Sequence, residues 1–255
     1  ISMLIGVVLG AINGLIVAYG GVPSIITTLG TLALFRVVLV EFSGARTVTT
    51  ADLPDWMNDV PSASLVSAGG YDLRLMVGIA LVVVVLGQLT LRYLPFGRRL
   101  YAIGSNPDAA RTAGLPVKRD VFLAFTISGM LAGLAGFMFL VRFGNITVTA
   151  AQGLELQVVA AVVVGGVNIF GGSGSMIGAL LGVLMIEILQ QSLLRWAGIS
   201  EFVKDAILGL LILVAITADA VILGRLREMW VRVRRRDREL AQGVSLDEGG
   251  VVHGA

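Results

Sequence analysis

Long, uninterrupted apolar segments most limit what this 255-residue chain can fold into. A helix needs about 20 apolar residues to cross a bilayer, and somewhat fewer where the bilayer thins locally. Such segments lie at residues 3–19, 25–40, 75–91, 121–141, 156–167, 177–194 and 202–223. The sequence therefore predicts an all-α fold, a polytopic bundle of about seven transmembrane spans. Segment 156–167 is short, and we expect a broken or partly re-entrant helix there.

The composition supports lipid as the solvent and excludes several chemistries. Hydrophobic residues make up 56% of the chain and charged residues only 14%, against about 25% charged in soluble domains. There is no cysteine, which excludes disulfides, thiol catalysis and cysteine-ligated metals. His253, the single histidine, lies in a Gly-rich tail, so we expect no metal and no cofactor in this chain.

Charges between the segments predict the topology. Arginines are concentrated in residues 92–120 and again after residue 223, which places both regions in the cytoplasm. Four segments separate the two regions, an even number, so the assignments agree. Residues 41–72 carry five acids and one basic residue, Arg46, and are expected to form the longest external loop.

We divide the chain into residues 1–223, a transmembrane domain, residues 224–240, a basic juxtamembrane helix, and residues 241–255, a disordered tail. In the second part Leu226 and Trp230 fall at helical spacing opposite arginines, which indicates contact with membrane lipid and not with nucleic acid. The chain begins at Ile1 without a Met, within an apolar run and with no basic region before it, so we expect its true start to be missing.

Glycines recur at four-residue spacing, the pattern that lets membrane helices approach closely. They are Gly6, Gly10 and Gly14, then Gly129 and Gly133, then Gly174, Gly178 and Gly182. The run at residues 165–178, GGVNIFGGSGSMIG, is also Gly-rich, but it lacks lysine and the phosphate-loop pattern. We expect a cytoplasmic turn between two helices there.

The segment YAIGSNPDAARTAGLPVKR, residues 101–119, predicts a short helix. Asn106 is suited to cap it, Pro107 to its first position and Gly114 to a left-handed stop. Two turns are too few to be stable alone in water, so either the rest of the loop or a partner protein must hold the helix.

This segment resembles the coupling loop of the permease family of ABC importers for ribose, xylose, rhamnose or autoinducer-2, with its GxNxxAAxxxGI-like motif. The segments VPSIITTLGTLALFR, AAVVVGGVNIFGGSGS and GALLGVL resemble the same family in the same order, over most of residues 6–219. The residues that match the coupling loop are Gly104, Ser105, Asn106, Ala109, Ala110, Arg111 and Gly114. The chain departs from the family at Val37 and at Gln190 and Gln191.

The resemblance implies a channel subunit in the bacterial inner membrane that passes a monosaccharide or sugar-like solute. It implies as partners a cytoplasmic ATPase subunit that binds ATP and magnesium, a periplasmic solute-binding protein, and a second permease subunit, identical or related. The chain itself would then be no enzyme. Because full members of the family are longer at the N-terminus, the resemblance also implies that one to three helices precede Ile1.

Polar residues within the spans are candidates for the solute path, because burying them in lipid is costly. They are Asn13, Thr27, Thr28, Thr31, Glu187, Gln190 and Gln191. The threonines can instead bond back to their own helix. Glu187, Gln191 and Arg195 share one helix face and either line a pore or form a structural network. Likewise Glu201 and Asp205 either stabilise a helix N-terminus or meet a partner.

Two other functions compete with the importer. An ion-coupled secondary transporter of small polar solutes would need an ionisable residue in the membrane, and Glu187 is the candidate. An intramembrane enzyme would need a nucleophile, base or metal-ligand set that the spans do not contain.

Overall fold

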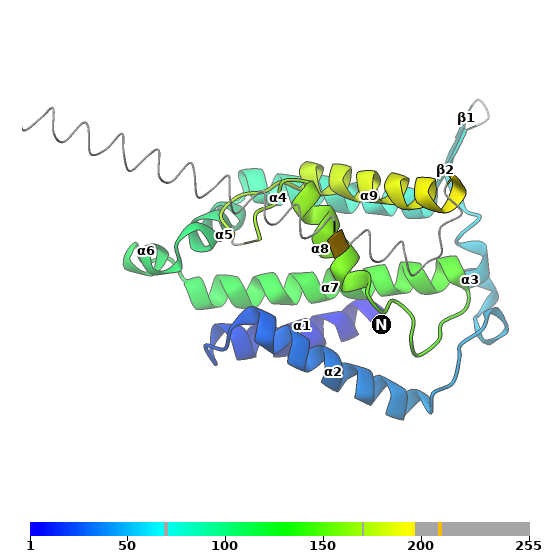
Figure 1. Ribbon diagram of the computed structural model, residues 1–255, viewed down its shortest axis with the longest axis horizontal. Helices are drawn as coiled ribbons and strands as arrows, with labels where there is room; N and C mark the ends of the chain where they lie inside the picture. Colours follow the sequence, from blue (N-terminus) through cyan, green and yellow to red (C-terminus); the bar gives the residue numbers. More distant parts are fainter. Residues whose placement is uncertain (69–70, 170, 197–208, 211–255) are drawn as a thin grey trace, which may run out of the picture. The chain divides into compact units, whose positions relative to one another are not determined.

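The computed structural model describes residues 1–68, 71–169, 171–196 and 209–210, and Figure 1 shows their helices and strands. They belong to two compact units, Ile1–Met185 and Ile186–Ala255. The elements are α1 (Ser2–Ala18), α2 (Ser24–Ser43), the 3-10 turn η1 (Thr50–Asp52), α3 (Asp55–Asp59), β1 (Ser64–Ala68), β2 (Tyr71–Arg74), α4 (Leu75–Tyr93), α5 (Pro95–Ser105), α6 (Pro107–Thr112), α7 (Val117–Phe143), α8 (Leu154–Val164) and α9 (Met176–Trp196). Helix α9 begins in the first unit and continues into the second.

Three of the described helices, α2, α4 and α7, are long and apolar enough to cross a membrane. Helix α1, helix α8 and residues Met176–Ser192 of α9 are apolar but shorter. The prediction of about seven spans is therefore not confirmed. Helix α8, at 11 residues, extends about 16 Å, roughly half of a hydrocarbon core of about 30 Å. Of segment 202–223 only residues 209–210 are described, and the expected regions 224–240 and 241–255 lie outside the described residues, as do Glu201 and Asp205.

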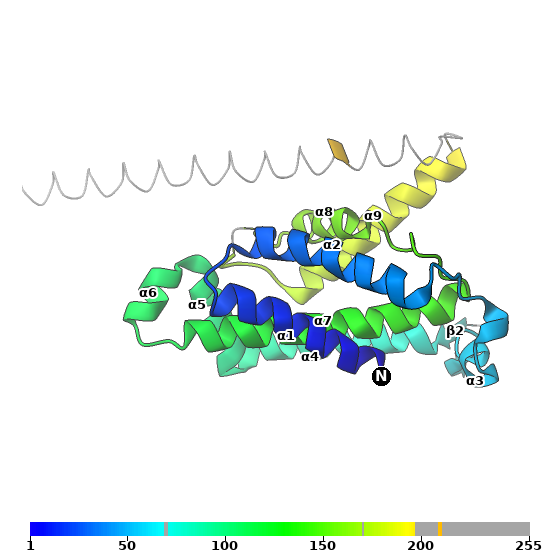
Figure 2. The same ribbon diagram turned by 90° about the horizontal axis from the view of Figure 1, so that it is seen from below.

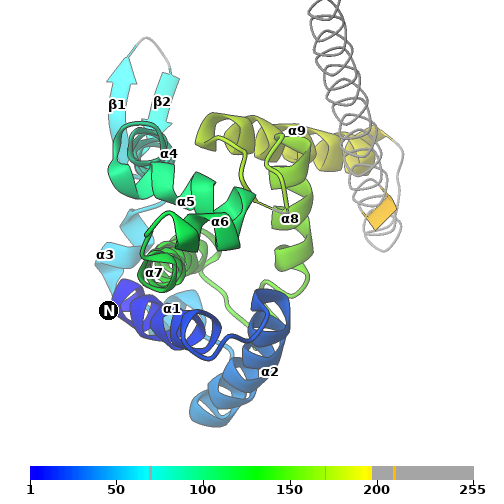
Figure 3. The same cartoon turned by 90° about the vertical axis from the view of Figure 1, so that its left-hand side faces the viewer.

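Helices α1 and α7 lie side by side in all three views (Figure 3), and their glycines form the contact. A Cβ at Gly6 would overlap the carbonyl oxygen of Gly129, and one at Gly10 would lie 2.9 Å from the Gly129 Cα. A Cβ at Gly133 would overlap the carbonyl oxygen of Ser2. The backbones therefore touch directly, and the close helix contact expected from the glycine spacing is confirmed for this pair.

A second glycine contact joins α8 to the first turns of α9. A Cβ at Gly178 would overlap the Gly165 carbonyl oxygen, and one at Gly182 would overlap that of Ala161. Gly174 does not belong to this stripe, contrary to our prediction, because α9 begins only at Met176. Gly174 lies in the preceding turn with φ +151, a backbone conformation that side-chain-bearing residues rarely adopt.

The predicted external loop contains a short antiparallel hairpin that the all-α prediction missed. Strands β1 and β2 pair with Ser67 opposite Asp72 and Ala68 opposite Tyr71, and a register shift falls between Ser64 and Val66. In the sequence the strands are separated by Gly69 and Gly70, a dipeptide typical of two-residue hairpin turns, which is the signal that could have found them.

The loops before and after α7 lie at opposite ends of that helix (Figure 2). At one end α5 contacts the first turn of α7 through Asp120. At the other end Val48 forms an antiparallel bridge with Ile146, and the Trp56 ring stacks on the Phe137 ring with centroids 6.4 Å apart. Between residues 120 and 143 the helix rises about 35 Å, which is enough to cross the hydrocarbon core. The arrangement agrees with loops on opposite sides of a membrane.

Candidate functional site

Helix α6 has the caps that the sequence predicts. The Asn106 side chain accepts hydrogen bonds from the backbone N–H groups of Asp108 at 3.1 Å and Ala109 at 3.0 Å. Pro107 occupies the first helical position. At the other end Gly114, with φ +79, ends the helix, and the Leu115 N–H donates to the Ala110 carbonyl oxygen at 3.0 Å. The sequence therefore determines both ends of this six-residue helix locally.

The rest of the same loop holds α6 in place. Ala110 is 5% exposed and forms an apolar cluster with Ile103 of α5 and Val117 of α7, with Leu115 and Val121 packed against it. The sequence left open whether the loop or a partner holds this helix, and the structure provides support from the loop itself. Ala110 thus faces its own chain, whereas the neighbouring Ala109 is exposed and available to a partner.

A buried ion pair fixes α5 to α7. The Arg99 Nε donates to Asp120 Oδ2 at 2.6 Å, and the Arg99 Nη2 donates to Asp120 Oδ1 at 3.2 Å. Asp120 is fully buried while the Arg99 side chain is 34% exposed. The hydrogen bond to Asp120 raises the pKa of Arg99 above its ordinary value. Two parallel bonds restrict both the distance and the orientation between α5 and the first turn of α7.

Sequence reasoning missed this pair, because it counted Arg99 only among the charges that set topology. The available signal was Asp120 itself, an acid that directly follows Lys118 and Arg119 in an otherwise basic stretch.

The Gly-rich turn between α8 and α9 packs on α5. The Tyr101 hydroxyl donates to the Gly174 carbonyl oxygen at 2.6 Å. A Cβ at Gly104 would lie 2.6 Å from the Gly172 nitrogen, and Gly171 and Gly172 have φ values of +90 and +84. The prediction of a turn between two helices is confirmed, and its glycines adopt dihedrals that other residues rarely adopt. Its glycines leave room for the backbone of α5, which joins the α8–α9 connection to the helix that precedes α6.

The candidate solute-path residues are spread over three helices. Thr27 and Thr31 are the two buried residues of α2, and their hydroxyls donate to the carbonyl oxygens of Pro23 and Thr28 at 3.2 Å each. Thr28 likewise bonds back to Ser24 at 3.0 Å. These bonds are the alternative to pore lining that the sequence allowed, and the hydroxyl oxygens keep lone pairs free for another donor.

Two amide side chains contain buried atoms without hydrogen bonds. The Asn13 Oδ1 and the Gln190 Nε2 are buried and have no partner within the described part of the chain. On α9, Glu187 and Gln191 are exposed while Gln190 is buried, so the acid and the buried amide lie on different faces. The side chain of Arg195 lies outside the described residues. Within the described residues there is no group of three or more His, Cys, Asp or Glu side chains arranged to hold a metal.

Comparison with known proteins identifies the family. The model of the family described as branched-chain amino acid transport system, permease component, matches residues 1–216. The chain belongs to this permease family. The resemblance to permeases of sugar importers is also confirmed, since the relatives include import permeases for ribose and autoinducer 2. The apolar helices and the family both indicate that this chain is an integral membrane protein.

Individual relatives are about one third identical to this chain. The autoinducer 2 import system permease of Enterobacter sp. (strain 638) is 35% identical over 236 residues, which are 92% of this chain and 65% of the relative. The ribose import permease of Haemophilus influenzae is 35% identical over 223 residues, 86% of this chain and 67% of the relative. The chain thus spans about two thirds of the length of the curated relatives that it matches. No solved structure matches it.

Proposed function

We propose that this chain forms the transmembrane channel subunit of an ATP-binding-cassette importer in the bacterial inner membrane. The observation that carries the proposal is the family match together with a rigidly held α6 at one end of α7. A separate cytoplasmic ATPase would bind ATP and magnesium, a periplasmic protein would deliver the solute, and a second permease subunit would complete the channel. In this assignment the chain itself catalyses no reaction.

Helix α6 is suited to pass motion between the ATPase and the spans. Its exposed side carries Asp108, Ala109 and Thr112, while Ala110 joins it to α5 and α7. The Arg99 and Asp120 pair continues the connection into α7. A displacement of α6 is therefore transmitted to a membrane-crossing helix through packed side chains and not through a flexible loop. We assign the contact with the ATPase to the exposed Ser105, Asn106, Ala109 and Gly114. Gly104 and Ala110 support this segment from inside, and the exposed Arg111 lies beside it.

The proposed solute is a monosaccharide or a sugar-like molecule. The ribose and autoinducer 2 import permeases among the relatives favour this class over the amino acids in the family description. Neutral donors and acceptors suit sugar hydroxyls. We propose Asn13, Thr27, Thr28 and Thr31 as path residues, together with Glu187, Gln190 and Gln191 on α9. The buried Asn13 Oδ1, which has no hydrogen-bond partner among the described residues, supports this role, because a solute hydroxyl would donate to it.

The substitution Ala109→Trp tests the coupling assignment. Because Ala109 is exposed, the chain should insert and fold normally. The indole would separate α6 from the ATPase, so solute uptake should fall about tenfold or more while ATP hydrolysis continues uncoupled, or the ATPase should no longer co-purify. Both are measured in vesicles with the cognate ATPase and binding protein.

The matched control is Ala80→Trp, since Ala80 is also exposed but lies within α4. It should leave uptake per ATP unchanged. Normal uptake and normal co-purification in Ala109→Trp would contradict the coupling role of α6 and favour the ion-coupled transporter.

Orientation has its own test, made simple by the absence of cysteine. A cysteine at the exposed Ser105 should react with an impermeant maleimide only from the cytoplasmic side, and one at the exposed Ser62 only from outside. The reverse labelling pattern would overturn the proposed topology.

A further inference from the structure

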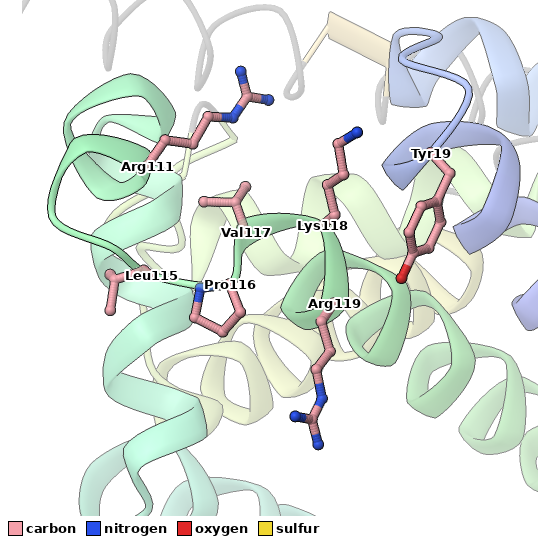
Figure 4. Close-up of a pocket in the computed structure, with 7 residues that line it drawn as sticks. All are labelled: Tyr19, Arg111, Leu115, Pro116, Val117, Lys118 and Arg119. Atoms are coloured by element: carbon pink, nitrogen blue, oxygen red, sulfur yellow. The ribbon is translucent and has the colours of Figure 1, made fainter.

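We propose that a basic pocket beside α6 binds the phosphate headgroup of an anionic phospholipid, with one acyl chain lying along α1. The pocket is an open depression of about 380 Å³ where the end of α1 meets the loop between α6 and α7. Figure 4 shows Arg111 and Lys118 extending on one side of the segment at Pro116, with Tyr19 facing it from the end of α1. The remaining lining residues are Leu115, Val117 and Arg119.

The pocket has a net positive charge that its surroundings do not neutralise. None of its lining residues is acidic. Lys118 and Arg119 have no acidic partner in the part of the chain that the structure describes, since the adjacent Asp120 is buried and bonded to Arg99. Asp108 lies 3.6 Å from Arg111, but it is 91% exposed and its attraction is weakened by solvent. An anion is therefore the ligand that this charge favours.

The position of the pocket along α7 matches the headgroup layer of a bilayer. At 27 residues α7 is about 40 Å long, close to the thickness of a bilayer with its polar layers. Lys118 and Arg119 belong to its first turn and so lie at headgroup depth. Tyr19, which packs edge-on against Phe122 with ring centroids 6.2 Å apart, is of the residue type enriched at this depth.

An exposed apolar face leads away from the pocket along α1. Val8, Ile12, Leu15 and Tyr19 follow each other at spacings of four, three and four residues and are 57%, 42%, 57% and 55% exposed. From Tyr19 to Val8 the face extends about 16 Å, which is roughly the depth of one hydrocarbon leaflet. A free phosphate or an acidic protein segment would use only the charges. A phospholipid satisfies the charges and covers the apolar face, and this combination decides for lipid.

Tryptophan quenching by brominated lipid tests the proposal on the full chain. Trp56, Trp196 and Trp230 are replaced by Phe, and Leu15→Trp supplies a reporter on the exposed face of α1. The protein is placed in phosphatidylcholine bilayers that contain increasing amounts of brominated phosphatidylglycerol or brominated phosphatidylcholine. We expect brominated phosphatidylglycerol to quench this reporter at a much lower mole fraction in the bilayer than brominated phosphatidylcholine does. A reporter at Val82→Trp, which is exposed on α4 away from the pocket, should respond to both lipids alike.

Charge removal identifies the binding groups. Each of Arg111→Gln and Lys118→Gln should reduce the phosphatidylglycerol preference of the Leu15→Trp reporter about fivefold, the contribution of one basic residue near an anionic surface. Arg98→Gln, an exposed arginine on α5 outside the pocket, should leave it unchanged. Equal quenching by the two lipids, or an equal loss in Arg98→Gln, would overturn the proposal. Release of the ATPase by Lys118→Gln with unchanged lipid preference would instead make the pocket a protein docking surface.

Discussion

Helix α7 is held in two different ways along its length. Against α1 it packs through glycines, with backbone on backbone between Gly10 and Gly129. At its first turn it joins α5 and α6 in a corner made by side chains, the Arg99 and Asp120 ion pair and the apolar cluster around Ala110. We call this second region the α6 corner.

The difference follows from the two solvents. In lipid, apolar side chains gain nothing by leaving their surroundings, so helices associate where small residues permit close van der Waals contact. At the membrane surface water is present, and burying apolar groups and pairing charges stabilise the chain again. The α1–α7 contact should therefore be sensitive to volume and insensitive to charge, while the α6 corner should be sensitive to both.

The largest expected effect is at the glycine contact. In Gly133→Leu the new side chain would overlap the Ser2 carbonyl oxygen and Met3, so α1 and α7 must separate. We expect destabilisation of about 3 kcal/mol or more and a reduced folded yield in detergent. The matched control is Gly136→Leu on the same helix, because a Cβ at Gly136 would meet no described residue within 4 Å. Equal thermal unfolding midpoints for Gly133→Leu and Gly136→Leu would show that α1 and α7 are not held by close glycine contact.

A smaller effect is expected for volume at the α6 corner. Ala110→Leu should lower the free energy of unfolding by about 1–3 kcal/mol, since Ala110 is enclosed by Ile103 and Val117. Ala109→Leu, one residue away and exposed, should change it by less than about 0.5 kcal/mol. Thermal unfolding in the same detergent compares the two. If both variants unfold alike, α6 is not packed against its own loop.

The smallest effect is expected for charge at the α6 corner. Asp120→Asn keeps the shape but replaces a charge-assisted bond with a neutral one, and the amides of residues 101–105 should exchange hydrogen roughly fivefold faster. Asp108→Asn removes a charge from the pair of Asp108 and Arg111, whose side chains are 91% and 61% exposed respectively. This variant should not measurably change the exchange of these amides. Hydrogen exchange followed by mass spectrometry resolves this segment. Unchanged protection in Asp120→Asn would mean that packing alone holds α5.

Local signals determined much of what could be predicted. Apolar length predicted that the chain is mostly helical, although only α2, α4 and α7 of the described helices are long enough to cross a membrane. Asn106, Pro107 and Gly114 predicted the ends of α6, because caps involve only neighbours in sequence. Glycine spacing predicted close contact at Gly6, Gly10, Gly129 and Gly133. It did not predict which helices would pair, since a four-residue repeat marks a face but not the partner of that face.

Only the tertiary structure decided which residues of α6 face inward. Ala109 and Ala110 are adjacent residues of the same type, and no sequence pattern distinguishes them. In the structure Ala109 is exposed, whereas Ala110 is buried at 5% exposure. The pairing of Arg99 with Asp120 joins residues 21 positions apart on two different helices. Such contacts depend on how α5 folds back onto α7, and that geometry results from the packing of the whole loop, which no local pattern encodes.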